Sequence, residues 1–169
     1  MPVITKRLLV FTLVATIPFS VSTLLAEQTN PVHAHIGHVM DGFRSTPDGQ
    51  GLLPTAIAEA KIAAQHAALV AGSAENLDGM KRHAGHVLHA VDPSEISSGP
   101  GLGFGVKPAA VGASRHIRMA ADSEGASGNV TTHTQHVETS ANNTVERADE
   151  LIALAKAIQE ATTVVSAAT

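Results

Sequence analysis

The chain has 169 residues, of which 44% are hydrophobic, 15% charged and 2% aromatic, and it carries ten histidines but no cysteine. Without cysteine there is no disulfide scaffold, no c-type haem attachment, no thiolate metal site and no thiol nucleophile. A net charge of −4 and the scarcity of aromatic rings argue against a nucleic-acid partner, because such proteins present basic surfaces and stack bases on aromatic side chains.

The first 26 residues have the layout of a secretory signal peptide. The basic pair Lys6 and Arg7 precedes an apolar run over 8–19, and small residues follow up to Ala26. Cleavage would leave 27–169, a chain of one domain with a net charge of −6, in the periplasm or outside the cell. It would then have no transmembrane segment. The alternative is a retained anchor, because the apolar stretch is nearly long enough to span a bilayer.

Five helices are expected after this segment. Asn30 and Pro31 suit the N-cap and first position of a helix. The third helix should stop before Pro93, because the residue that precedes a proline disfavours the helical region. The last helix is either continuous or broken near Asn142 and Asn143, where two cap-forming residues sit together. The expected helices span residues 31–43, 54–71, 75–91, 108–121 and 127–161.

The sequence repeats itself at a shift of fifty residues. Residues 51–92 match 101–142 without a gap at ten of 42 positions, and three of these identities are histidines. A partial third copy lies in 31–43, because the motif HxxHV occurs there as well as in both full copies. We therefore predict an all-α fold. It is a bundle of about five helices built from a duplicated helical hairpin, with a four-helix-bundle-like core.

The histidines fall on similar faces of successive helices. His66 and His116 project among apolar residues, and the histidines of the HxxHV motifs lie within or beside apolar stripes. His33 and His89 look peripheral. Eight histidines are therefore the candidate metal ligands: His35, His38, His66, His83, His86, His116, His133 and His136.

Buried imidazoles need partners for their ring nitrogens, because an unpaired buried polar group costs about 1–3 kcal/mol. Few inward acidic or amide side chains are available as partners. The clearest candidate partner for His66 is Glu59, which precedes it by seven residues on the same helical face. A metal ion or a haem iron would satisfy one nitrogen of each ring. The histidines are therefore better explained as ligands than as isolated core residues.

Imidazole-rich sites suit copper, zinc and nickel. An HxxH pair places two rings on one side of a helix, with Cβ atoms about 5–6 Å apart. The chain has no ExxH or HExxH motif and no cluster of acidic residues, which excludes carboxylate-bridged di-iron, zinc-protease and calcium sites. The sequence thus predicts an extracytoplasmic transition-metal-binding protein for storage, delivery or sensing. Catalysis is less expected, because no acid–base pair or nucleophile accompanies the histidines.

Two alternatives stay open. Two inward histidines can hold haem b for electron transfer or haem carriage, with Gly37 and Gly85 leaving room for the macrocycle, although the core has few bulky side chains. The second alternative is a metal-free interaction module in which buried histidines act as a pH switch.

Overall fold

The structure is a computed structural model that describes residues 30–168. Within this range it contains helices and no strand, which confirms the predicted all-α bundle. The signal peptide predicted for 1–26 lies outside the described residues. Among the described helices, none is both long and apolar enough to cross a membrane. The helices are α2 (Pro31–Met40), α3 (Leu52–Gly72), α4 (Leu77–Val91), α5 (Val106–Asp122), α6 (Gly128–Glu160) and α7 (Val164–Ala168), with a 3-10 turn at Pro47–Gly49.

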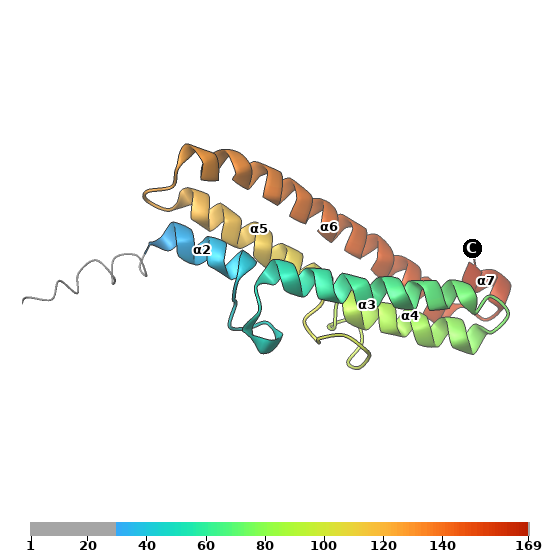
Figure 1. The fold of residues 1–169 in the computed structure, drawn as a ribbon. Coiled ribbons are helices and arrows are strands. Elements are labelled where there is room, and N and C mark those ends of the chain that lie inside the picture. The colour runs from blue at the N-terminus through green and yellow to red at the C-terminus, as the bar shows by residue number, and fades with distance from the viewer. Residues whose placement is uncertain (1–29, 169) are drawn as a thin grey trace, which may run out of the picture.

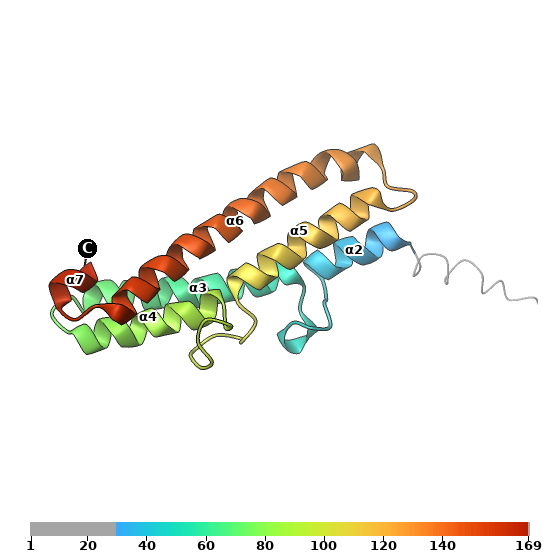
Figure 2. The ribbon, with the colours of Figure 1, turned by 180° about the vertical axis from the view of Figure 1, so that it is seen from behind.

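The helices lie in three adjacent rows, which we call legs. Helices α2 and α3 follow one another along the first leg, α4 and α5 return beside them, and α6 runs the length of the molecule (Figure 1). The loops over 41–51 and 92–105 interrupt the first two legs, as the reverse view also shows (Figure 2). Helix α6 packs against α4 and α5, and α2 and α3 also pack mainly against these two helices. The middle leg therefore positions both of its neighbours.

Local sequence signals set most helix ends. The side chain of Asn30 accepts a hydrogen bond from the backbone N–H of Val32 at 2.9 Å, so α2 begins at the expected residue. It ends at Met40, three residues earlier than expected. Helix α6 continues through Asn142 and Asn143 without a break. The 3-10 turn and α7 were not expected, because segments this short carry too little periodicity to be recognised.

The core is built from small side chains. Ala63, Ala84 and Ala148 come together from α3, α4 and α6, with Val87 and Ile152 beside them. Because alanine lets helix axes approach closely, the interior is narrow and little apolar surface separates one leg from the next. The histidines at the helix junctions therefore lie within reach of the neighbouring helix.

Glu59 of α3 organises the loop between α4 and α5. The side chain is fully buried, and its carboxylate accepts hydrogen bonds from the backbone N–H groups of Leu102, Phe104 and Gly105 at 2.9–3.0 Å. The expected pairing of Glu59 with His66 is therefore wrong, because the backbone of the loop occupies the carboxylate. Gly105 has φ +92°, and a Cβ there would lie 2.8 Å from the Val91 carbonyl oxygen, so the loop requires glycine.

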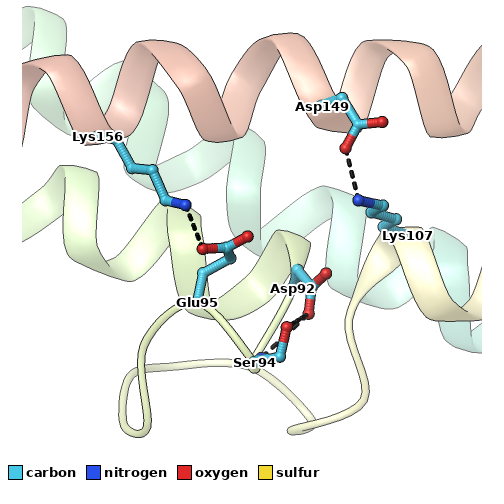
Figure 3. Close-up of polar contacts among 6 residues, drawn as sticks. All are labelled: Asp92, Ser94, Glu95, Lys107, Asp149 and Lys156. Carbon is cyan, nitrogen blue, oxygen red and sulfur yellow. Dashed lines mark hydrogen bonds and ion pairs between the residues drawn. The ribbon is translucent and has the colours of Figure 1, made fainter.

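Two ion pairs join α6 to the ends of the same loop (Figure 3). Lys156 of α6 pairs with Glu95, and Lys107 at the start of α5 pairs with Asp149 of α6. These side chains are partly exposed, so each pair contributes at most about 1 kcal/mol. They hold the loop in position rather than stabilise the bundle.

Candidate metal centre

The first trio consists of His35 and His38 of α2 and His116 of α5. One ring nitrogen from each residue lies within 4.8 Å of the other two. The Nδ1 atom of His116 is central: it lies 3.1 Å from Nδ1 of His35 and 3.3 Å from Nδ1 of His38. The ring of Phe43 closes one side, with its centroid 5.1 Å from that of His116. All three histidines are half-buried.

The second trio has the same construction on another pair of helices. His83 and His86 of α4 form the HxxH pair, and His66 of α3 supplies the third ring. Nδ1 of His66 lies 3.2 Å from Nδ1 of His83 and 3.3 Å from Nδ1 of His86. In both trios an HxxH pair on one helix meets a single histidine from the helix packed against it.

Hydrogen bonds do not fully satisfy these contacts. A neutral ring nitrogen carries either one proton or one lone pair. The central Nδ1 therefore forms a well-aligned hydrogen bond with at most one of its two neighbours in each trio. A metal ion between the three nitrogens converts the same arrangement into three bonds.

Three of the histidines, His66, His86 and His116, have lowered pKa values. Burial, and next the charge of His83, lowers the pKa of His66. Burial is also the largest cause that lowers the pKa of His86 and of His116. The second cause is the charge of His66 for the pKa of His86 and the charge of His38 for the pKa of His116. Each pKa lies below the usual 6.5, so these rings are neutral at pH 7 and their lone pairs are free for a metal.

In each trio, the two nitrogen distances from the central Nδ1 are close to the edge of a coordination tetrahedron. With zinc–nitrogen bonds of about 2.0–2.1 Å, ligand atoms of a tetrahedral site stand about 3.3–3.4 Å apart. The close Nδ1 pairs of both trios are separated by 3.1–3.3 Å. Among the described residues, neither trio includes a fourth ligand from a histidine or a carboxylate. An ion held there would keep one open position.

The third HxxH pair is not part of a trio. His133 and His136 of α6 are both exposed and are joined by no third ligand within residues 30–168. His133, expected within or beside an apolar stripe, is therefore exposed, although it lines an apolar hollow with Val130 and Val137. The fifty-residue alignment would group His116 with this pair, but the packing of α2 against α5 brings His116 to the HxxH pair of α2 instead.

The two remaining histidines differ from each other. His33 is exposed, as expected for a peripheral residue. His89 is buried, and its Nδ1 lies 3.2 Å from the carbonyl oxygen of Pro100, so its expected peripheral position is wrong. His89 therefore holds the loop after α4 in place and does not belong to a ligand site. The apolar run Val87 to Val91, in which His89 lies, was the available signal for its burial.

The two HxxH motifs that belong to a trio differ from the third motif at one position. The motifs that enter a trio have glycine before the second histidine, at Gly37 and Gly85, whereas the motif on α6 has Gln135.

No family of known proteins, no curated protein and no solved structure matches this chain. The functional argument therefore depends on the geometry of the trios.

Proposed function

We propose that this protein binds divalent transition-metal ions at the two trios, one ion in each, as an extracytoplasmic storage, delivery or sensing protein. The main support is that three imidazoles converge through their Nδ1 atoms at each of two separate helix junctions. One such cluster is compatible with chance packing in a histidine-rich chain. Two with the same construction support a common ligand.

Among zinc, copper and nickel, zinc is the ion proposed here, because a site of three imidazoles with one open position is typical of tetrahedral zinc. Three neutral imidazoles suit all three metals, but nickel and Cu²⁺ favour square or octahedral arrangements, whereas zinc favours the tetrahedron. Copper has the highest intrinsic affinity for nitrogen ligands and is the expected competitor.

The same spacing supports an ion rather than haem. Two axial nitrogens on opposite faces of a haem iron stand about two metal–nitrogen bonds apart, roughly 4 Å, with the macrocycle between them. The Nδ1 contacts within the trios are 3.1–3.3 Å, so a flat ring does not fit between these Nδ1 atoms. Because each trio is half-buried and has an open position, a bound ion is accessible to an incoming ligand, and this favours exchange over permanent retention.

Elemental analysis and the visible spectrum of the untagged, secreted chain test the proposal. We expect at least two zinc ions per chain and no Soret band, and mass spectrometry of the same sample shows whether residues 1–26 are removed. The double variant His35→Ala/His116→Ala should lose one ion, and His66→Ala/His83→Ala the other. His33→Ala, at an exposed histidine outside both trios, is the matched control. Equal metal retention in all four proteins contradicts the assignment, and a Soret band selects haem.

A further inference from the structure

The HxxH pair of α6 has the geometry of a metal half-site. The ring centroids of His133 and His136 are 5.6 Å apart. The corresponding distances are 5.9 Å in the α2 pair and 5.6 Å in the α4 pair, both of which enter a trio. The three pairs are thus preorganised alike, and the α6 pair differs because its further ligands are absent from the described part of its own chain.

The pair borders an apolar groove that runs between α6 and the first leg. His133 lines one hollow of about 310 Å³ in this groove and His136 lines the adjoining one of about 330 Å³. Val39, Leu53 and Val137 line both hollows, which makes the groove continuous beside the pair. At its rim Met40 is 51% exposed and Leu53 is 40% exposed. Two imidazoles therefore stand next to apolar surface that lacks a cover within the described chain.

We propose that one zinc ion joins His133 and His136 of two copies of this chain, and that the rims of the two grooves cover each other in the same contact. A two-fold axis through the ion brings identical pairs together, so that four imidazoles complete a tetrahedral site. This inference rests on the proposed function only in its chemistry, because it assumes a chain that meets zinc. It does not require the trios to be filled.

Local charge does not oppose such a contact. Glu138, the acidic residue nearest to the pair in sequence, is paired with Arg118 of α5. The other residues of the groove beside the pair are apolar or uncharged polar. A second copy is the favoured occupant because it necessarily carries the two missing ligands, whereas a helix of unrelated sequence supplies only apolar cover.

The test is the molar mass of the full chain, measured by sedimentation or by light scattering in EDTA and with added zinc. We expect a monomer in EDTA and a dimer with zinc, holding one ion per two chains beyond those in the trios. His133→Ala/His136→Ala should remain a monomer at every zinc concentration and lose only the shared ion. Both residues are exposed, so this variant should keep its circular dichroism spectrum. His33→Ala should dimerise as the unaltered chain does.

Three results would overturn the inference: a monomer in excess zinc, a dimer in EDTA, or a dimer formed by His133→Ala/His136→Ala. The last two results would assign the groove to an apolar contact without metal. A variant with both trios disabled, His66→Ala/His116→Ala, separates the two proposals. If the trios bind nothing, its zinc content equals that of the unaltered chain, while its zinc-dependent mass still reports on the shared site.

Discussion

Replacing His66 and His116 together by alanine tests whether the trios are metal sites or structural contacts. Each of these rings makes both close Nδ1 contacts of its trio. The double variant therefore leaves two separate HxxH pairs, each with two ligands instead of three. Neither ring is fully buried, so alanine opens no sealed cavity in the core.

The size of the effect follows from binding linkage. Zinc at about 100 times its dissociation constant stabilises the folded chain by about 2.7 kcal/mol per site, or roughly 5 kcal/mol for two independent sites. In a chain of this length, 1 kcal/mol shifts Tm by about 3 °C. We expect zinc to raise the Tm of the unaltered protein by about 10–20 °C and that of His66→Ala/His116→Ala by less than about 4 °C, measured by calorimetry.

The metal-free comparison is the sharper half of this test. In EDTA the double variant should be as stable as the unaltered chain or more stable, because alanine removes from each junction a desolvated imidazole whose two close nitrogen contacts cannot both be well-aligned hydrogen bonds. His33→Ala should behave as the unaltered chain in both conditions. The reasoning is refuted if the double variant gains as much Tm from zinc as the unaltered chain. It is also refuted if the variant loses more than about 2 kcal/mol in EDTA, since the trios would then be structural.

Three further outcomes are expected. The folded-state pKa values of His66 and His116 are lowered by burial and then by neighbouring imidazoles, so the native chain binds fewer protons than the unfolded one. The metal-free stability should therefore fall as pH drops below about 6.5, and urea titrations from pH 8 to 5 should show a smaller fall in the double variant. Glu59→Gln should cost about 2–3 kcal/mol in urea unfolding, because an amide offers one acceptor atom to three N–H donors; an unchanged midpoint would remove Glu59 as the anchor of the loop. Lys156→Ala, which breaks a partly exposed ion pair with Glu95, should cost less than about 1 kcal/mol, and a larger loss would contradict its peripheral role.

The sequence was sufficient for the fold class and for most helices. Caps such as Asn30 and the stop before Pro93 act within one turn of the chain, so they can be recognised without tertiary information. The continuity of α6 through Asn142 and Asn143 could not be decided, because cap-forming residues and helix interior compete locally. Packing against α4 and α5 favours the helix there.

The grouping of the histidines was harder to predict than their presence. Periodicity shows which face of a helix carries a ring, but not which neighbouring helix meets that face. The fifty-residue alignment alone would associate His116 with the α6 pair, whereas α5 packs against both α6 and α2, and His116 lies with the α2 pair. Glu59 illustrates the same limit, because its partners are backbone groups of a loop 43–46 residues away, which no local pattern reveals.

The two trios sit at different junctions, and this should make the effect of each ion local. The first joins α2 to α5 and the second joins α3 to α4, while α2 contributes a single side chain, Val39, to the buried apolar cluster that it shares with Leu52 and Ala113. The α2 helix has ten residues, too few for independent stability in water, and among its residues Val32 and Val39 alone are buried. Zinc should therefore slow amide hydrogen exchange in α2 of the unaltered chain. In His35→Ala/His116→Ala this protection should vanish from α2 while zinc still protects α3 and α4. If exchange slows equally in both halves of the variant, the ions stabilise the bundle as a whole and the sites are not independent.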